Sequence, residues 1–422
     1  MRVLLYADAM NPDLPSEPGV IFNTARSLVD QVDEAVVVTQ IRNREAIDRA
    51  GFSHAEIVYL DTEYIARPVW KISSALRLNT ANLAAVKYPV QFAFERELWK
   101  RFGSDLKTGR FDILHRVGPI SSALPSPLAR WSPVPFVIGP VNGGLQYPES
   151  FKDVMRREGE WLRYIRNSYK ILPYARTTYT QAAAILAAFD HTIETLPAGN
   201  EDRIFDFPEV GADPDVFGSN AEIRHSTAER LTFLFAGRLV PFKCADVAVQ
   251  AFAQSPLLQK HRLVIAGDGP ERSALEQLVA RHSLQECVEF LGWTEKHVVA
   301  QYMQSANVFV FPSIRDAGAG VIAEAMMAGL PSVVVGYGPG RHLLDDRSGI
   351  RVPLGTRGDH IEGFKTAMET LAQDKDLCAA MGHAARLRAL ENLTWDVRAQ
   401  RIAEVYRWVT GACDKRPAGL LR

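Results

Sequence analysis

The sequence has few cysteines, no long apolar run and almost no net charge, and each absence excludes a class of protein. Its four cysteines, none in a Cys-x-x-Cys pair, give no zinc knuckle and no sign of a disulfide framework, so we expect a reducing compartment. No segment approaches the roughly 20 apolar residues that span a bilayer. A net charge of −1 argues against a dedicated nucleic-acid-binding protein.

The amino terminus and the length indicate where the protein resides and how many domains it has. The opening stretch MRVLLYADAMNPDLP has an apolar run of only Val3 to Tyr6, too short for a signal peptide, and it predicts a buried first strand. We therefore expect a cytoplasmic protein that is still able to lie on the inner face of a membrane. Its 422 residues exceed the size at which one core keeps growing, which predicts two domains.

Short apolar runs alternate with amphipathic segments along most of the chain. Such alternation predicts an α/β fold of doubly wound, Rossmann-like parallel sheets covered by helices on both faces. Helices are expected at Asp246–Gln254, Arg272–Arg281 and Thr394–Thr410. The predicted strands are Val3–Tyr6, Glu34–Thr39, Ile113–Leu114, Phe136–Ile138, Thr178–Thr180, Thr192–Thr195, Thr232–Phe235, Arg262–Ala266, Val288–Phe290, Val308–Phe311 and Ser332–Val335.

A change in pattern near residues 200–230 indicates a domain boundary. The stretch FDFPEVGADPDVFGSNAEIRHSTAER has two prolines, two glycines and no sustained period, as in a linker. We therefore predict a first domain over residues 1–205 and a second over residues 206–395. A terminal helix over residues 396–412 follows them.

Residues 65–176 are unusually basic, with 18 Lys or Arg against 8 Asp or Glu. Two interpretations stay open: solvated helix faces with core aromatics, or adsorption to an anionic membrane, where each basic residue contributes roughly 1 kcal/mol. Binding of nucleic acid is less favoured. The interleaved aromatic residues are Trp70, Tyr88, Phe92, Phe94, Trp99, Phe102, Trp161, Tyr164, Tyr169 and Tyr174.

The loop after Thr232–Phe235 has the residues of an anion site. Gly237, Arg238 and Lys243 lie between a predicted strand and a predicted helix, where backbone N–H groups and the helix dipole favour negative charge. Two cations there suit a departing diphosphate. The same residues are also compatible with an ordinary surface loop.

Three further strand-end loops contain small or acidic residues. LVIAGDGPE places Gly267 in a turn, and Phe290-Leu-Gly-Trp293 contains Gly292. In the fourth loop, Asp316 precedes a helix expected at Val321–Ala328 that contains Glu324. These acids either accept hydrogen bonds from sugar hydroxyls, or Asp316 caps the helix and Glu324 is an ordinary exposed residue.

As a set, these loops resemble a large family of retaining glycosyltransferases, family 4 or glycosyl transferases group 1, and in particular its exopolysaccharide-type members. AGRLVPFKCADVAVQAF is similar to the G-R-L-x-x-x-K-G-x-D segment of the family, LVIAGDGPE to its G-x-G-P turn, and FPSIRDAGAGVIAEAMMAGLPSVV to its Glu-x7-Glu motif. The resemblance covers about 180 residues of the second domain. It implies the GT-B fold, with two Rossmann-like domains facing across a cleft and the terminal helix returning to the first.

The resemblance implies a role for each matching residue. Arg238 and Lys243 would hold the phosphates of the donor, Glu324 the ribose, and Asp316 the donor sugar, while the loop at Gly292 and Trp293 would border the base. The remaining glycines that the resemblance assigns to donor binding are Gly19, Gly237, Gly267 and Gly318.

The sequence departs from the family pattern at three places. The first acid is Asp316 instead of glutamate, Cys244 replaces a glycine, and Ala317-Gly318-Ala319 replaces Gly-Phe-Gly. Aspartate is one methylene shorter, so the sugar must lie closer or water must bridge. We interpret these changes as altered sugar preference.

The first domain has candidates of its own. His115 ends a predicted strand and is expected to face the cleft, where the family often has a histidine near the donor sugar; a structural role is the alternative. Asn142, Gly143 and Gly144 end a G-P-x-N-G-G loop that begins at Gly139. It is similar to a loop of polysaccharide-type members, and we expect it on the acceptor side of the site. Gly19 either lets backbone approach the ligand or forms a plain turn.

The reaction implied is transfer with retention from a nucleotide sugar, UDP-linked first and GDP-linked second, to a saccharide or lipid-linked acceptor. The catalytic group would comprise His115, Asp316, Arg238 and Lys243. We expect no cofactor beyond the co-substrate, and no metal, because no cleft loop has an Asp-x-Asp clamp. The alternatives are a sugar-nucleotide epimerase or hydrolase of the same fold, and a non-catalytic nucleotide-sugar-binding scaffold.

Overall fold

The computed structural model describes residues 1–75, 84–157, 166–218 and 229–421, and the chain groups into two units. Unit 1 comprises Met1–Gly144, Trp161–Glu209 and Trp395–Arg422. Unit 2 comprises Leu145–Glu160 and Val210–Thr394. The short segment from Leu145 thus groups with unit 2, although the chain before and after it belongs to unit 1.

Unit 1 is built on a seven-stranded parallel sheet with the order β3-β2-β1-β4-β5-β6-β7. Its strands are β1 (Arg2–Tyr6), β2 (Glu34–Gln40), β3 (Ala55–Leu60), β4 (Ile113–Arg116), β5 (Phe136–Val141), β6 (Ala184–Ala187) and β7 (Ile204–Asp206). Its helices are α1 (Glu17–Val29), α2 (Arg44–Ala50), α3 (Glu63–Ala75), α4 (Ala84–Lys107), α5 (Leu128–Trp131), α7 (Ala175–Thr180), α8 (Phe189–Ile193) and α17 (Trp395–Val409).

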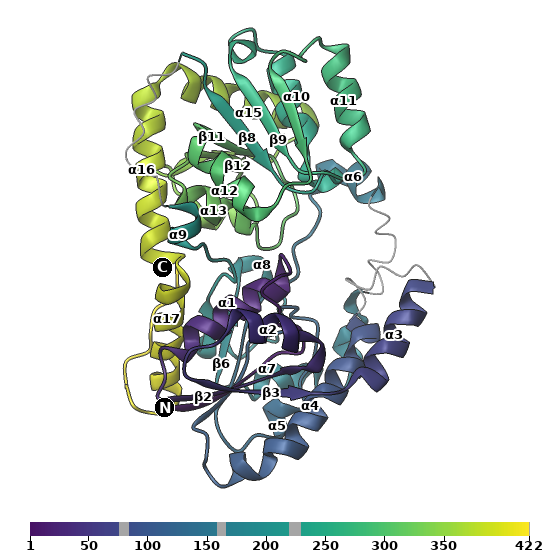
Figure 1. The fold of residues 1–422 in the computed structure, drawn as a ribbon, viewed down its shortest axis with the longest axis vertical. Helices are drawn as coiled ribbons and strands as arrows, with labels where there is room; N and C mark the ends of the chain where they lie inside the picture. Colours follow the sequence, from purple (N-terminus) through teal and green to yellow (C-terminus); the bar gives the residue numbers. More distant parts are fainter. Residues whose placement is uncertain (76–83, 158–165, 219–228, 422) are drawn as a thin grey trace. The chain divides into compact units, whose positions relative to one another are not determined.

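Alternation of side chains along β1 shows how unit 1 fills both faces of its sheet. Val3 and Leu5 join the core with α1 and α17, whereas Leu4 and Tyr6 join the core with α4 and α7. Helix α17 packs against α1, which confirms the prediction that the terminal helix returns to the first domain (Figure 1).

Unit 2 has a six-stranded parallel sheet with the order β10-β9-β8-β11-β12-β13. Its strands are β8 (Thr232–Ala236), β9 (Arg262–Ala266), β10 (Val288–Gly292), β11 (Val308–Phe311), β12 (Ser332–Val335) and β13 (Gly349–Val352). Its helices are α6 (Lys152–Arg157), α9 (Pro214–Phe217), α10 (Ala245–Ala253), α11 (Arg272–Arg281), α12 (Lys296–Ser305), α13 (Gly320–Met327), α14 (Pro339–Leu343), α15 (Arg357–Gln373) and α16 (Lys375–Asn392).

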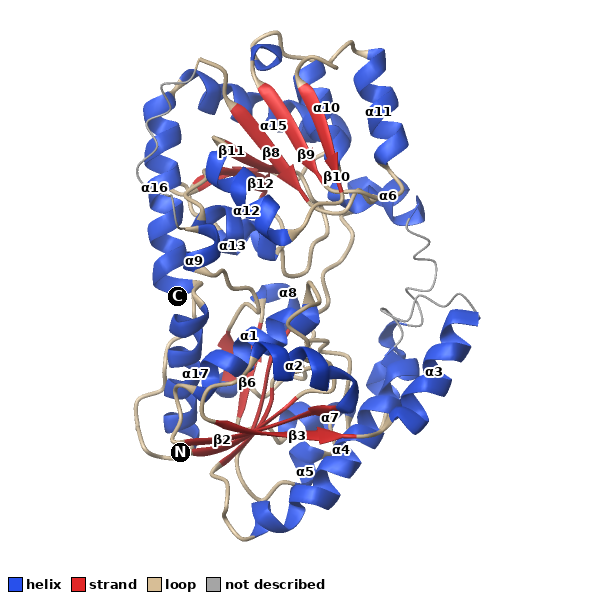
Figure 2. Ribbon diagram, in the orientation of Figure 1, coloured by secondary structure: helices blue, strands red, loops and turns tan. Residues whose placement is uncertain are grey.

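The strands of unit 2 are apolar on both faces, as expected for a parallel sheet covered on both sides by helices. Phe233, Leu234 and Phe235 of β8 are all fully buried, and Figure 2 shows the strands of each unit enclosed between helices. The prediction of doubly wound parallel α/β sheets is therefore confirmed.

Two predicted strands, Thr178–Thr180 and Thr192–Thr195, are wrong, because these residues belong to or follow the short helices α7 and α8. Hydroxyls of several of these threonines bond within the local turn, as where Thr178 Oγ1 donates to Tyr174 O at 2.8 Å, whereas Thr192 Oγ1 donates to Gly143 O at 3.0 Å. Strands β3, β6, β7 and β13 were not predicted. Part of the proposed linker is regular, since β7 and α9 lie in it, and residues 219–228 lie outside the described residues.

No helix in the described part of the chain is long and apolar enough to cross a lipid bilayer.

Candidate functional site

The loops that follow β8, β9 and β10 are bonded to one another at the carboxyl edge of the unit 2 sheet. The N–H of Gly237 donates to Ala266 O at 2.9 Å, and the N–H of Gly267 donates to Gly292 O at 2.8 Å. A Cβ at Gly267 would lie 1.9 Å from the carbonyl oxygen of Gly237, and its φ is +152°, so only glycine fits. These loops form a fixed rim where doubly wound sheets bind ligands.

Lys243 and Asp316 meet at this rim. Lys243 ends the short 3₁₀ turn Pro241–Lys243 before α10, and its ammonium forms an ion pair with the Asp316 carboxylate. The ammonium also lies 4.6 Å from the centroid of the Phe311 ring. The side chains are 13% and 23% exposed, so the pair is largely shielded but within reach of a ligand. An anionic ligand can therefore take the place of the carboxylate as partner of Lys243.

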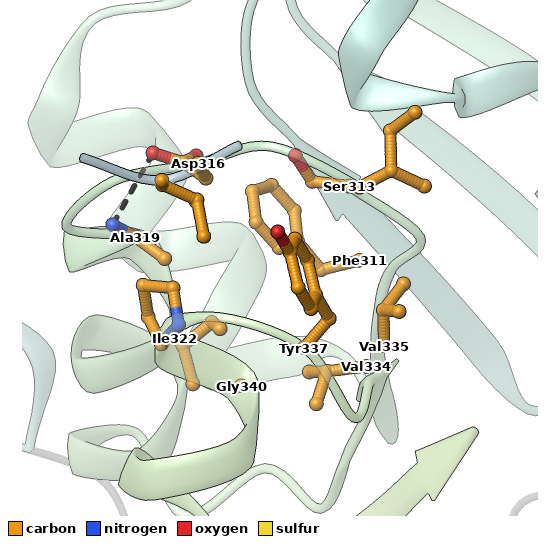
Figure 3. A pocket seen from close by; sticks show the side chains of 12 residues that line it. Phe311, Ser313, Asp316, Ala319, Ile322, Val334, Val335, Tyr337 and Gly340 are labelled. Carbon is orange, nitrogen blue, oxygen red and sulfur yellow. Dashed lines mark hydrogen bonds between the residues drawn. The ribbon is translucent and has the colours of Figure 1, made fainter. Parts of the chain in front are cut away.

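The other oxygen of Asp316 holds the entry into α13. Asp316 Oδ1 accepts a hydrogen bond from Ala319 N–H at 3.3 Å, and Ala319 has a left-handed φ of +53° (Figure 3). This bond orders the loop before α13, whose N-cap is Ala319 and has no side-chain cap, so Asp316 is not the capping residue of the helix. Contact with a donor sugar stays a prediction.

Glu324 projects from α13 and is not an ordinary exposed residue. Its side chain is 21% exposed, and Oε1 lies 3.5 Å from the Nζ of Lys296 on α12. Burial raises the pKa of Glu324, and the neighbouring Lys296 opposes that rise. A carboxylate in such surroundings is a strong acceptor for hydroxyl donors.

Arg238 and Trp293 are exposed on the rim. The Arg238 side chain makes no hydrogen bond or ion pair with any residue that the structure describes, which leaves its guanidinium available to an anion. Trp293 is 76% exposed and directly follows Gly292, whose φ is +73°. An exposed indole is a suitable stacking surface for a flat ring.

A small pocket opens beside Asp316 at the ends of β11 and β12 (Figure 3). Its walls are mostly apolar, with the Asp316 carboxylate and the Ser313 and Tyr337 hydroxyls as polar groups. The lining residues are Leu145, Phe311, Ser313, Ile314, Asp316, Ala319, Ile322, Val334, Val335, Tyr337, Pro339 and Gly340.

Cys244, which replaces the glycine of the family pattern, has a left-handed φ of +51°. This explains why glycine suits the position. The thiol is buried, accepts from Arg357 Nη1 at 3.4 Å, and burial raises its pKa to about 12. It is therefore a packed structural group and not a nucleophile.

His115 has both ring nitrogens engaged within unit 1, and its place at a cleft near the donor sugar stays a prediction. It lies in unit 1 and is fully buried; Nδ1 bonds to the Tyr406 hydroxyl, and Nε2 lies 2.7 Å from Gly139 O. Burial lowers the pKa of His115 to about 3, so the ring is neutral at pH 7. The structural alternative describes it better.

Asn142 and its glycines are also engaged within unit 1. Asn142 Nδ2 donates to Glu209 Oε1 at 2.6 Å, and Oδ1 lies 3.2 Å from His191 Nε2. A Cβ at Gly143 would lie 2.4 Å from Ser122 Oγ, and one at Gly144 would lie 2.5 Å from a Thr195 methyl group. These glycines allow internal packing, and their acceptor-side role stays a prediction.

Gly19 lies in the first turn of α1, also in unit 1. A Cβ there would lie 2.6 Å from the carbonyl oxygen of Leu14, so glycine is needed for the chain to fold back on this helix. The turn interpretation accounts for it. Gly318 lies in the loop between Asp316 and α13, as the motif predicts.

Of the residues that line the pocket, the sequence predicted only Asp316 as a site residue; it missed Leu145 and Tyr337 among others, and also Arg315, which bonds to Leu145 O. Tyr337 could have been found, since it follows the predicted strand Ser332–Val335 at the edge that binds ligands. Arg315 precedes Asp316 within the motif. Leu145 had no signal, because its sequence position lies in the first half of the chain.

Comparison with known sequences identifies the second unit. Residues 219–388 match the family described as "Glycosyl transferases group 1". The chain is 30% identical over 246 residues to a GDP-mannose-dependent alpha-(1-6)-phosphatidylinositol monomannoside mannosyltransferase of Mycolicibacterium smegmatis, a match over 55% of this chain and 59% of that protein. It is 31% identical over 184 residues to a D-inositol 3-phosphate glycosyltransferase of Streptomyces avermitilis, covering 41% and 39% of the two chains. The chain thus spans about half the length of these relatives.

Comparison with solved structures extends over both units. HepE of Anabaena, crystallised with UDP and glucose, superposes with a TM-score of 0.60 over 96% of this chain and 98% of that chain, at 16% identity. A likeness at this identity establishes the fold, two parallel α/β sheets of GT-B type.

Proposed function

Through residues 219–388 the chain belongs to the glycosyl transferases group 1 family, and on this premise we propose that it is a retaining glycosyltransferase using a nucleotide-diphosphate sugar. The observation that carries the proposal is the rim of unit 2. There the partly exposed ion pair of Lys243 and Asp316, the guanidinium of Arg238, which has no partner among the described residues, and the partly shielded carboxylate of Glu324 surround loops already fixed by hydrogen bonds.

In the proposed complex the donor lies along this rim. Its diphosphate takes over Lys243 from Asp316 and engages Arg238, so that two cations face two phosphates. The freed Asp316 carboxylate accepts from a sugar hydroxyl, and Glu324 accepts from the ribose. Trp293 borders the base.

The chemistry required of these residues is electrostatic. The acceptor hydroxyl attacks the anomeric carbon on the face from which the diphosphate departs; the bond to the leaving oxygen breaks, and the hydroxyl proton passes to a phosphate oxygen. Lys243 and Arg238 stabilise the charge that develops on the leaving group, which is where preorganised charges accelerate a reaction most. No step requires a protein nucleophile or a metal ion.

For the donor we propose a UDP-sugar first and a GDP-sugar second. HepE binds UDP and glucose, which supports the first, and the mycobacterial relative is described as GDP-mannose-dependent, which supports the second. For the acceptor we propose a saccharide or lipid-linked saccharide used in cell-surface polysaccharide synthesis.

Helix α3 supports contact with the inner face of an anionic membrane. It exposes Trp70 (69%), Tyr64 (62%) and Ile72 (59%); helical spacing places Tyr64 with the basic residues Arg67 and Lys71, and Trp70 and Ile72 on the two flanks of that face. Aromatic and aliphatic groups among cations are typical of helices that lie in a bilayer interface.

The other aromatics of the basic region do not contribute to this surface in the same way. Phe94 and Phe102 are core residues, as the alternative interpretation held, while Trp161 and Tyr164 lie outside the described residues.

Replacement of both Trp70 and Ile72 by serine should reduce cosedimentation with phosphatidylglycerol vesicles at least fivefold and leave the weak binding to phosphatidylcholine unchanged. Equal cosedimentation of variant and wild type would remove α3 from the proposal.

Nucleotide binding tests the proposed donor site. Thermal-shift measurements with UDP, GDP, ADP and their sugars should show that at least one nucleotide stabilises the wild type. A ligand at 100 times its dissociation constant adds about 2.7 kcal/mol to the free energy of unfolding. Lys243→Ala should abolish the shift, while Lys365→Ala, a surface lysine of unit 2 paired with Glu362, should retain it. A wild type that no nucleotide stabilises would overturn the proposal.

A non-catalytic scaffold is the second candidate, because both oxygens of Asp316 already have partners within the chain. Release of nucleoside diphosphate with transfer of sugar to an acceptor by the purified protein separates the two. The scaffold binds nucleotide sugar without turnover, and an epimerase or hydrolase changes the sugar without an acceptor.

A further inference from the structure

A segment from the first half of the chain lies across the ligand-binding edge of unit 2. Residues Leu145–Arg157, here named the strap, group with unit 2 although residues up to Gly144 belong to unit 1. The strap contains a short 3₁₀ turn, Glu149–Phe151, and helix α6. It follows the loop that ends in Gly143 and Gly144, so one continuous stretch of chain passes from one unit to the other.

The amino-terminal end of the strap is held by the loops that follow β11 and β12. Arg315 Nε donates to Leu145 O at 3.4 Å, and the Tyr337 hydroxyl donates to Gln146 O at 2.9 Å. The Arg315 guanidinium lies 4.4 Å from the centroid of the Tyr147 ring. The residue next to Asp316 is thus fixed against the strap.

The remainder of the strap packs beside the loop that contains Lys243. Phe151 is 1% exposed and meets the buried ring of His360 edge to face at 5.4 Å. Its ring lies 5.9 Å from the guanidinium of Arg357, which pairs with Asp246 at the start of α10. At its far end Arg157 forms an ion pair with Glu271, next to α11. The strap therefore contacts the loops after β8, β9, β11 and β12.

Leu145 brings the strap into the pocket beside Asp316. It is 5% exposed, and eleven of the twelve lining residues come from positions 311–340, with Leu145 as the twelfth. Leu145 closes against Gly338, where a Cβ would lie 3.2 Å from Leu145 Cδ2. Tyr337 and Ile322 line the same pocket (Figure 3).

We propose that the strap forms one wall of the donor-sugar site, with Leu145, positioned by Tyr337, limiting which sugar fits beside Asp316. This rests on the proposed function. A leucine side chain cannot hydrogen-bond a hydroxyl or an acetamido group, so it excludes bulky or polar substituents from its side of the sugar while Asp316 binds hydroxyls on the other.

The test compares two sugars carried on the same nucleotide. Titration calorimetry gives the ratio of the affinities for the two nucleotide sugars and the affinity for the free nucleoside diphosphate. The ligands are UDP, UDP-glucose and UDP-N-acetylglucosamine, or GDP, GDP-fucose and GDP-mannose for a protein that prefers GDP. Leu145→Ala should shift this ratio toward the bulkier sugar by about fivefold or more. The affinity for the free nucleoside diphosphate should stay within twofold. Leu387→Ala, on α16 of the same unit and 46% exposed, should change neither quantity.

Tyr337→Phe supplies a second variant that keeps the ring and removes only the hydroxyl bond to the strap. It should shift the same ratio in the same direction, by a smaller factor. Unchanged ratios in both variants, with nucleotide still bound, would overturn the strap proposal alone. Failure of the wild type to bind any nucleotide would instead overturn the proposed function.

Discussion

Near the carboxyl end of its sheet, unit 1 buries the polar side chains of His115 and Asn142, whereas unit 2 leaves its charged groups within reach of solvent. His115 and Asn142 of unit 1 are 0% and 6% exposed, and partners within the unit bind both. Lys243 and Asp316 of unit 2 are 13% and 23% exposed, and Arg238 is more exposed still.

The difference separates groups that hold a loop in place from groups that bind a ligand. Both kinds occupy equivalent positions after parallel strands, so position in a doubly wound sheet is not enough to assign a function. A buried neutral imidazole with two hydrogen bonds stabilises the fold. Lys243, by contrast, is paired with the partly exposed carboxylate of Asp316, and it can change partner when an anion binds. The residues that we propose for donor binding, Lys243, Asp316, Arg238 and Glu324, therefore all lie in unit 2.

The largest expected effect is on Lys243. Replacing it by alanine removes the charge that faces the leaving phosphate, so transfer should fall by roughly 100-fold to 1,000-fold, as on loss of one preorganised group at a developing charge. Steady-state release of nucleoside diphosphate measures it, with Lys365→Ala as the matched control. Near-normal turnover of Lys243→Ala would contradict the proposal that the exposed charged groups of unit 2 bind the ligand.

Glu95 is a buried carboxyl of unit 1, and it tests whether this unit holds such a group in its neutral form. Its carboxyl accepts hydrogen bonds from Tyr6, Gln91 and Ser126, and burial raises its pKa from 4.5 to about 7. A carboxyl with a raised pKa stabilises the fold fully below pH 4.5 and loses that contribution as the pH rises through 7. The rise corresponds to roughly 3 kcal/mol.

The free energy of unfolding of the wild type, minus that of Glu95→Gln, should therefore decrease by up to about 3 kcal/mol from pH 4.5 to neutral pH. Urea unfolding of both proteins at several pH values measures this difference, and groups common to both cancel. A difference that does not vary with pH would show that Glu95 is not held in a buried, neutral form.

His115→Phe keeps the ring volume and removes both hydrogen bonds, which leaves the Tyr406 hydroxyl and the Gly139 carbonyl without their partner. The free energy of unfolding should fall by about 2 kcal/mol. The affinity of the folded protein for nucleotide should stay within twofold. Unchanged stability combined with a tenfold loss of turnover would restore His115 as a catalytic candidate.

The smallest effect is expected at Cys244. Cys244→Gly relieves a left-handed backbone conformation worth roughly 1 kcal/mol, but it also empties a buried site and removes a contact of Arg357. The two changes offset, so the free energy of unfolding should change by less than about 1 kcal/mol. A loss of several kcal/mol would mean that the thiol is required for packing.

The sequence predicted most of unit 2 and its rim, because the evidence there is local. A strand, a glycine with positive φ and a charged residue within ten positions define each loop, as at Gly237 and Lys243. Asp316 and Glu324 likewise lie within one motif. The unit 1 strand β6 was missed because its sequence, Ala-Ile-Leu-Ala, has neither alternation nor β-branched enrichment.

What the sequence could not predict depends on long-range contacts. The sequence around His115 gives no sign that its Nδ1 nitrogen is hydrogen-bonded to the hydroxyl of Tyr406, which lies 291 residues away. Leu145 enters the pocket of unit 2 from the other half of the chain. Burial by distant segments decided both outcomes, and it cannot be read from a local pattern.

The most direct test is an experimental structure of the protein with a nucleoside-diphosphate sugar bound. The account predicts phosphates beside Arg238 and Lys243, a broken Lys243–Asp316 ion pair, the ribose at Glu324, and the sugar between Asp316 and Leu145. A ligand bound elsewhere, with the Lys243–Asp316 pair intact, would contradict it.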